Sequence, residues 1–290
     1  RMKSGFANLI GRPNVGKSSI LNRLIGEKLA IVTNKPQTTR VPMKFIYTDE
    51  RMQVVFFDNP GYQRPKNKLN RVMNEEILAN LKDGDINLYV VDNSLETGRL
   101  DSDVFELAAE DKTPKALLVN KSDELSPEEK VLLDEKYQDM GIFDRVIFIS
   151  ALRGDGFDDL LDYVYETLDE GPKYYDDEFI TDLPVRDIMR EILREKCLIH
   201  LDEEIPHGIY IDIDDYEETE DKIRVRFIMY IERDSHKAIV IGKNGSMINK
   251  IIKDAEKDMT HFCGKNVKIK IDIKTRKNWR KEDRLVSRWF

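Results

Sequence analysis

The sequence is poor in the features that mark membrane-spanning and disulfide-bonded proteins. It has 290 residues, and no apolar run in it approaches the ~20 residues that a transmembrane helix needs. Its first residues show no signal-peptide pattern. Its two cysteines, Cys197 and Cys263, lie far apart, which favours buried thiols over a disulfide or a metal site, and its four histidines have no metal-ligand spacing. We therefore expect no membrane-spanning helix, no disulfide framework and no histidine-based metal centre.

Negative charge dominates the chain as a whole but not its last quarter. The net charge is −8, yet the segment from Lys222 to Phe290 contains 19 lysines and arginines against 8 acidic residues. The first 221 residues contain 28 basic and 47 acidic residues. An acidic body with a basic end indicates that the C-terminal part binds a polyanion, although a solvated lysine-rich face would give the same composition.

The order of apolar patterns predicts two domains, as the length also does. Short apolar runs alternate with helical periodicity up to about residue 170, which predicts a doubly wound α/β domain over residues 1–170. A Gly-Pro pair and an acidic, tyrosine-containing run follow, and we interpret residues 171–183 as a linker. Residues 184–290 contain helical patterns and three strictly alternating strands, which predicts a smaller α+β domain.

The most specific pattern lies near the N-terminus. The chain there reads Gly11-Arg12-Pro13-Asn14-Val15-Gly16-Lys17-Ser18-Ser19, and residues 11–18 fit the phosphate-binding loop G-x-x-x-x-G-K-[ST]. An apolar run precedes it and helical spacing follows it, as such a loop requires. Lys17 is predicted to reach the β- and γ-phosphates, and the Ser18 hydroxyl to hold Mg²⁺. The pattern alone leaves open ATP or GTP, and hydrolysis or phosphoryl transfer.

A second motif follows the strand predicted over residues 53–57. That strand ends in Asp58-Asn59-Pro60-Gly61. Because ligands bind at the carboxyl ends of strands in such sheets, Asp58 is a candidate Walker-B-like aspartate on Mg²⁺. Gly61 would let a backbone N–H approach the γ-phosphate.

A third motif selects the base. The strand predicted over residues 115–119 ends in Asn120-Lys121-Ser122-Asp123. A carboxylate at Asp123 accepts from both N1–H and the amino group of guanine, whereas adenine leaves it unpaired. Later, Ser150-Ala151-Leu152 follows another strand and offers backbone N–H groups to guanine O6. An ordinary polar turn is the alternative, but the order of the three motifs favours a guanine site.

The second domain contains a short glycine motif, Ile241-Gly242-Lys243-Asn244-Gly245-Ser246. G-x-x-G alone is compatible with a simple turn between helices. The amphipathic helix that follows and the three alternating strands make the region resemble a KH domain, whose GxxG loop clamps the backbone of four nucleotides. The resemblance makes Lys243 a phosphate contact.

A basic stretch near the C-terminus has two interpretations. It contains one aromatic residue among its cations, and its candidate RNA-binding residues are Lys274, Arg276, Lys277, Trp279 and Arg280. The cations would contact phosphates while Trp279 stacks on a base. Alternatively, Trp279 covers the edge of the sheet.

The motifs of the first domain resemble, in content and order, the translation-factor-related class of small GTPases. This resemblance implies that Thr39, or its neighbour Thr38, closes on Mg²⁺ and the γ-phosphate. It implies catalytic roles for Lys17, Thr39, Gly61 and Asn14, the last as the ligand of an activating K⁺. Two residues depart from common patterns: Asn59 replaces the usual threonine, and Tyr62 follows Gly61 where Ras-like enzymes have a water-orienting glutamine. Tyr62 predicts slow intrinsic hydrolysis.

The combination of the two domains is similar to a family of bacterial ribosome-assembly GTPases. The resemblance implies a monomer that binds GTP and GDP, the 3′ end of small-subunit ribosomal RNA and the precursor of the 30S subunit. It also implies a cytoplasmic protein with a peripheral inner-membrane fraction. Two alternatives remain at this point: a P-loop ATPase or kinase, and an RNA-binding module that is independent of nucleotide.

Overall fold

The computed structural model describes residues 2–28, 30, 39–40, 42–65, 67–282 and 284–286. The chain clusters into two compact units that divide between Asp182 and Leu183, except that Asn67–Leu69 group with the second unit. The segment that we interpret as a linker, residues 171–183, thus groups with the first unit except for its last residue.

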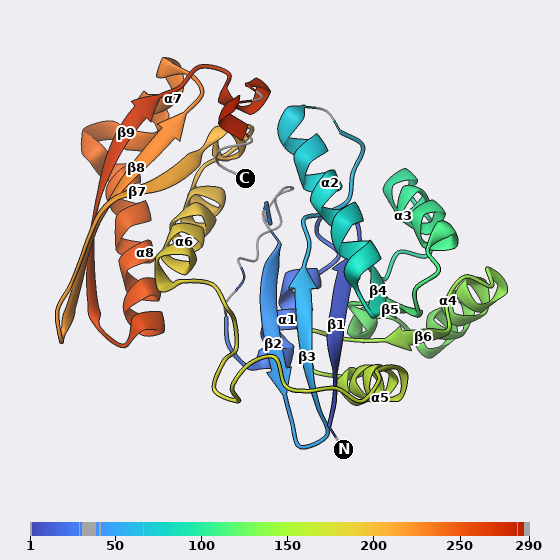
Figure 1. The fold of residues 1–290 in the computed structure, drawn as a ribbon. Helices are drawn as coiled ribbons and strands as arrows, with labels where there is room; N and C mark the ends of the chain where they lie inside the picture. The colour runs from blue at the N-terminus through green and yellow to red at the C-terminus, as the bar shows by residue number, and fades with distance from the viewer. Residues whose placement is uncertain are drawn as a thin grey trace. The chain divides into compact units, whose positions relative to one another are not determined.

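The first unit is built on a six-stranded sheet with the strand order β2-β3-β1-β4-β5-β6. Its strands are β1 (Lys3–Ile10), β2 (Met43–Thr48), β3 (Met52–Asp58), β4 (Ile86–Val91), β5 (Lys115–Val119) and β6 (Arg145–Phe148). Its helices, which Figure 1 shows on both faces of the sheet, are α1 (Lys17–Ile25), α2 (Lys68–Asp83), α3 (Arg99–Glu110), α4 (Pro127–Asp139), α5 (Phe157–Thr167) and the 3-10 turn η1 (Ser122–Glu124). The predicted α/β architecture is confirmed.

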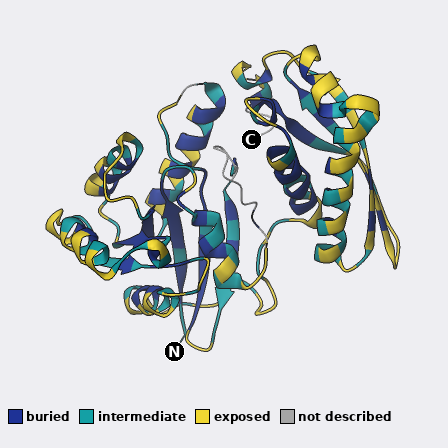
Figure 2. Ribbon diagram, turned by 180° about the vertical axis from the view of Figure 1, so that it is seen from behind, coloured by how far each residue is buried: buried dark blue, intermediate teal, exposed yellow. Residues whose placement is uncertain are grey.

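The sheet is mixed, because β2 runs antiparallel to β3 while every other pair of its strands is parallel. The strands β1, β3, β4 and β5 are buried along most of their length, and β4 is buried at every position, whereas the edge strand β6 is mostly half-buried (Figure 2). Strands of one direction end at one edge of a sheet. The P-loop, Asp58, Asn120 and Ser150 therefore gather at the same edge.

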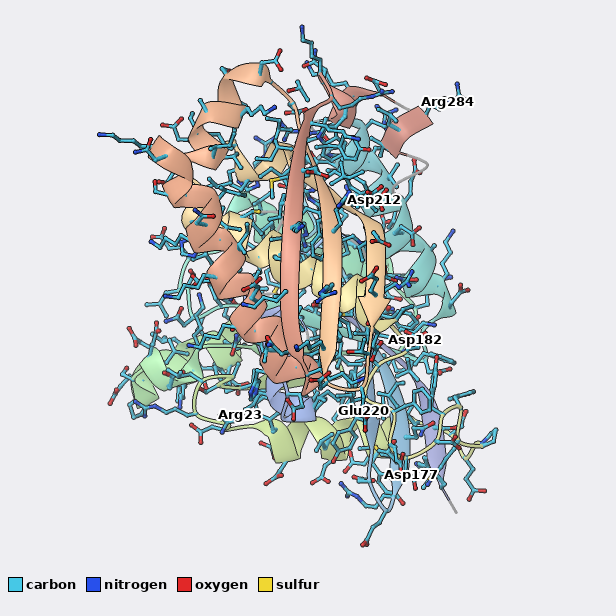
Figure 3. All side chains as sticks on the ribbon, turned by 90° about the vertical axis from the view of Figure 1, so that its left-hand side faces the viewer. Arg23, Asp177, Asp182, Asp212, Glu220 and Arg284 are labelled. Carbon is cyan, nitrogen blue, oxygen red and sulfur yellow. The ribbon has the colours of Figure 1, made fainter. Side chains whose placement is uncertain are left out.

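The last part of the first unit packs against its edge strand β2. The buried Gln53 side chain donates to and accepts from the main chain of this segment, at distances of 2.8 and 3.0 Å. The Ile46 N–H donates to the Ile180 carbonyl over 2.9 Å, and Lys44 pairs with Asp182 over 2.8 Å. These contacts explain why the segment belongs to the first unit. Asp182 is labelled in Figure 3.

The second unit has a three-stranded sheet, β7 (Tyr210–Glu218), β8 (Lys222–Ile231) and β9 (Asn266–Thr275). β7 pairs antiparallel with β8, and β9 pairs parallel with it. The helices are α6 (Val185–His200), α7 (Asp234–Ile241) and α8 (Ser246–Cys263), with 3-10 turns η2 (Pro206–Gly208), η3 (Lys243–Gly245) and η4 (Trp279–Lys281). α6 and α8 pack together and against the sheet. The predicted α+β fold is confirmed.

Among the described residues, no helix combines the length and the apolar character that spanning a bilayer requires.

Candidate functional site

The P-loop links β1 to α1, and close contacts require its two glycines. Gly16 has φ +101°, and a Cβ on it would lie 2.1 Å from the side-chain nitrogen of Asn120. A Cβ on Gly11 would lie 2.5 Å from the Val90 carbonyl oxygen. Asn120 also donates from Nδ2 to the Val15 carbonyl over 2.9 Å. The loop is thus fixed by its neighbours in the structure.

Lys17 points into the curve of this loop. Its side chain donates to the carbonyl oxygens of Gly11 and Arg12 over 3.1 and 3.0 Å, and the residue is buried. Burial lowers the pKa of Lys17 to about 8, against the attraction of Asp58, which raises it. A phosphate anion is the ligand that would best stabilise this buried cation.

Three side-chain oxygens meet beside the P-loop. Ser18 Oγ lies 2.5 Å from Asp58 Oδ2 and 3.2 Å from Thr39 Oγ1. Two hydroxyls and a carboxylate are hard oxygen donors of the kind that Mg²⁺ takes together with phosphate oxygens. These residues fit a Mg²⁺ site that the nucleotide would complete. The alternative ligand Thr38 lies outside the described residues.

The D-x-x-G motif lies directly against the P-loop. A Cβ on Gly61 would lie 2.7 Å from the Pro13 backbone nitrogen, and the Tyr62 N–H donates to the Gly11 carbonyl over 2.8 Å. The Tyr62 ring packs against the hydrophobic core beside β4 and β5. Position 62 therefore holds a half-buried tyrosine packed on the core, where Ras-like enzymes have a glutamine.

Asn59 belongs to a buried network of amide side chains. It donates to the Leu9 carbonyl over 3.1 Å and accepts from Asn80 over 2.9 Å. Asn8, in turn, donates to Asn87 over 2.9 Å. The asparagine at position 59, unusual for the motif, is thus accommodated by partners on β1 and α2.

The guanine-motif residues are brought together by two loops. Asn120 Oδ1 accepts from the Ala151 N–H over 3.2 Å, and the Ser150 hydroxyl donates to Asp123 over 2.7 Å. That hydrogen bond lowers the pKa of the Asp123 carboxyl, which keeps it ionised. Lys121 takes the left-handed conformation, with φ 59°. Leu152 is exposed at the outer end of the second loop.

The Arg12 side chain is held by carboxylates. It lies 2.5 Å from Asp92 and 3.1 Å from Asp101. Both partners are largely buried, so the side chain of this P-loop residue anchors the loop to β4 and α3. Asn14 has φ 67°, so it occupies the left-handed region.

The second unit presents its glycine motif between α7 and α8. Gly242 and Gly245 have φ of +74° and +78°, and Asn244 has φ 53°. Lys243 and Asn244 are exposed, as is Ser246 at the start of α8. Ile241 and Gly242 are half-buried. The turn thus exposes its polar residues, as a backbone clamp requires.

The C-terminal basic stretch needs one correction. Trp279 is fully buried, lies 6.0 Å from the Tyr210 ring and donates from Nε1 to the Gly208 carbonyl over 2.8 Å. Burial of the ring contradicts stacking on a base, and the contact with Tyr210 on the edge strand β7 fits the alternative that Trp279 covers the edge of the sheet. Arg280 pairs with Glu232 over 2.6 Å. The other three candidates, Lys274, Arg276 and Lys277, are exposed.

Family models match both units. Residues 6–121 match a model described as 50S ribosome-binding GTPase, and residues 204–280 match a KH domain model. Curated relatives match over nearly the full length. "GTPase Era" of Clostridioides difficile is 43% identical over 96% of this chain and 95% of that protein. The chain belongs to the Era family of GTPases.

Solved Era structures have the same fold. An Era in complex with MgGDPNP and nucleotides 1506–1542 of 16S ribosomal RNA superposes with a TM-score of 0.93 at 28% identity, covering 100% of this chain and 99% of that one. An Era variant from Aquifex aeolicus bound to GDP and AlF₄⁻ gives the same TM-score and identity over 99% of each chain. The resemblance inferred from the motifs is thus confirmed.

Sequence reasoning missed one residue beside the guanine motif. Arg23, on α1, donates to the carbonyls of Leu152 and Arg153 over 3.2 and 3.1 Å, and it is labelled in Figure 3. A Cβ on Gly154, where φ is +91°, would lie 2.5 Å from the Arg23 guanidinium. Glycine at 154 thus leaves room for this contact. Arg23 lies about 130 residues from Arg153 in the sequence, so no sequence motif connects it with this loop.

Proposed function

We propose that this Era-family protein is a GTP-hydrolysing switch that binds the 3′ end of small-subunit ribosomal RNA during assembly of the 30S subunit. The observation that carries the proposal is that one chain joins a preformed guanine-nucleotide site to an exposed GxxG loop. Its similarity over the full length to an Era that was solved with a Mg²⁺-bound GTP analogue and 16S RNA supports both halves.

The nucleotide site would work through three groups of residues. The P-loop from Gly11 to Ser19 holds the phosphates, with Lys17 as the cation against the β- and γ-phosphates. Ser18, Thr39 and Asp58 would supply oxygens to Mg²⁺, and the bound ion would supply positive charge against the phosphates. The last group, Asp58 to Gly61 at the end of β3, presents a backbone N–H to the γ-phosphate.

Base selection would depend on the loops after β5 and β6. Asp123 accepts from N1–H and the amino group of guanine, while Lys121 covers the ring. Of the backbone N–H groups of residues 150–152, that of Leu152 would meet O6, because Ser150 donates to the Asp155 carbonyl and Ala151 to Asn120. The Asn120 side chain hydrogen-bonds to Val15 and to Ala151, and it thereby links the guanine-binding loops to the P-loop.

We infer slow intrinsic turnover, and K⁺ as an accelerating ion at Asn14. The Tyr62 ring packs in the core, so hydrolysis lacks a water-orienting side chain at that position. The test of the K⁺ site is single-turnover hydrolysis in K⁺ and in Na⁺ buffers. A faster rate in K⁺ that Asn14→Ala abolishes is expected, and equal rates for the wild type in both buffers would exclude the ion.

In the second unit, residues 241–246 would clamp the RNA backbone, with Lys243 on a phosphate. The exposed candidates Lys274, Arg276 and Lys277, at the end of β9, would also contact the RNA. GTP would favour the RNA-binding state, and hydrolysis would release the RNA. The family resemblance also supports a monomeric, cytoplasmic protein with a peripheral inner-membrane fraction.

The decisive experiment measures binding of a single-stranded RNA that matches the small-subunit 3′ end, with a GTP analogue, with GDP and without nucleotide. Tight binding only with the GTP analogue, lost in Asp123→Ala, is expected for a guanine-gated switch. Binding that ignores the nucleotide would leave an RNA-binding module without a switch. Competition of ATP with GTP at similar concentrations would instead indicate a P-loop ATPase or kinase.

A further inference from the structure

On helix α8, which follows the GxxG loop, the acidic and the basic side chains have different environments. Each of three acidic residues on it has a basic partner within the second unit. Asp254 lies 2.5 Å from His200 Nε2, Glu256 lies 2.9 Å from Lys268, and Asp258 pairs with Lys196. These partners come from α6 and β9, the elements against which α8 packs. Glu256 and Asp258 are therefore neutralised by lysines from other elements, and Asp254 is held by a hydrogen bond to His200.

The lysines of the same helix have a different environment. Lys250, Lys253 and Lys257 are all exposed, and none of them forms an ion pair with any residue in the described part of the chain. Their spacing of three and four residues places them on one face, over about 10 Å of helix. That face is opposite the buried residues Ile251, Ala255 and Met259. We call these three lysines the α8 stripe.

The α8 stripe continues from the GxxG loop. α8 begins at Ser246, directly after the loop, and the exposed Lys243 adds a fourth cation at that end. Figure 3 shows side chains of α8 pointing away from the three-stranded sheet of its own unit. A GxxG loop holds only four nucleotides, so a longer RNA must continue over a neighbouring surface. A row of unneutralised cations that starts at the loop is complementary to a phosphate backbone.

We propose that the α8 stripe binds the phosphates of RNA nucleotides that adjoin the segment held by the GxxG loop. The proposal rests on the proposed RNA binding by the second unit, and it adds a second contact surface to that site. Lysine is suited to this role because its flexible stem brings a point charge to a backbone without reading sequence. The stripe therefore contributes affinity and salt dependence, while the loop sets the register.

The test compares two single-stranded RNAs on the full chain with a GTP analogue. One has about six nucleotides, enough for the loop, and the other extends the same sequence to about twenty. The test variant is Lys250→Gln, Lys253→Gln and Lys257→Gln combined, since glutamine preserves helix propensity. The matched control is Lys222→Gln, Arg226→Gln and Lys270→Gln combined, which removes the same charge from the exposed face of β8 and β9.

For the long RNA, the stripe variant should bind about tenfold more weakly at moderate salt. Its slope of log affinity against log salt should fall by about 2, because each phosphate contact to a single strand contributes about 0.7. Its binding of the short RNA, and the binding of both RNAs by the control variant, should remain at wild-type values.

Three results would overturn the proposal. Equal weakening of both RNAs would indicate damage to the loop, and equal weakening by the control would indicate only general attraction by net charge. No weakening for the long RNA would show that the stripe does not contact its phosphates. If the wild type binds neither RNA, the proposed function itself fails, which is a distinguishable outcome.

Discussion

The two units solve the problem of binding a polyanion in different ways. In the nucleotide site, Lys17, Asn120, Asp123 and the Ser18 hydroxyl are all held by hydrogen bonds within the chain. Around the GxxG loop, Lys243 and the α8 stripe are exposed, and in the described structure none of them forms an ion pair. The first site is preorganised for one small ligand, whereas the second offers separate charges to an extended one. Single substitutions should therefore act strongly in the first unit and weakly in the second.

The largest effect is expected at the guanine carboxylate. Asp123→Ala removes the acceptor for two guanine donors and should weaken GTP binding by about 100-fold, or about 2.7 kcal/mol. Equilibrium binding of a fluorescent GTP analogue measures this loss. Asp139→Ala, an exposed aspartate of the same unit, is the control. Unchanged preference for GTP over ATP in Asp123→Ala would break the assignment of the guanine site.

The next largest effect is expected in the second unit at a backbone position, which is an exception to the weak effects expected there. Gly242→Ala should weaken RNA binding by about tenfold and leave GTP binding unchanged. Gly242 has φ +74°, and an added Cβ would lie 2.7 Å from the Met247 backbone nitrogen.

Gly264→Ala is the matched control, because Gly264 also has positive φ but meets nothing within 4 Å of an added Cβ. RNA titrations and GTP binding on the same samples separate the two readouts. If both variants lose RNA affinity equally, general destabilisation explains the result and the shape of the loop does not.

A smaller effect is expected at the residue that supports the guanine loop. Arg23→Ala removes two hydrogen bonds to the carbonyls of Leu152 and Arg153, and it should weaken GTP binding about three- to tenfold. The loss should be smaller for 6-thio-GTP, whose sulfur accepts hydrogen bonds more weakly than O6. Arg71→Ala, an exposed arginine on α2, serves as control. Equal losses for both nucleotides would argue against a role in placing the O6 contact.

The smallest effect concerns the pair that holds the end of the first unit. Both Lys44 and Asp182 are about one-third exposed, and such pairs contribute less than about 1 kcal/mol. Lys44→Gln should therefore leave the unfolding temperature nearly unchanged. Amide hydrogen exchange at Ile46, whose N–H donates to Ile180, should become several-fold faster. Unchanged exchange would show that the segment is held at Gln53 alone.

The nucleotide site was largely predictable, because its residues lie in short motifs at strand ends. The strand–loop–helix order alone predicts that these motifs meet at one edge of the sheet; they are Gly11 to Ser18, Asp58 and Asp123. The strand and helix bounds followed for the same reason, since buried strands such as β4 are apolar runs bounded by polar turns.

The rest depends on contacts between distant residues. Trp279 is buried because Tyr210 and the Gly208 carbonyl receive it, and neither is marked in the sequence as its partner. Likewise, Asn59 satisfies its amide through Leu9 and Asn80 on two other elements. A basic stretch shows where cations are, but burial and pairing decide which of them stay available.

The last part of the first unit, up to Asp182, packs along the edge strand β2 and affects whether that edge can pair with another chain. An edge strand with free main-chain groups invites a strand from another chain to add to the sheet. Here the Ile180 carbonyl already accepts from Ile46, and Lys44 places a charge beside it. A chain cut at residue 170 would uncover that edge and should self-associate more readily than one that ends after residue 182. The segment that joins the two units should thus also reduce aggregation through the β2 edge.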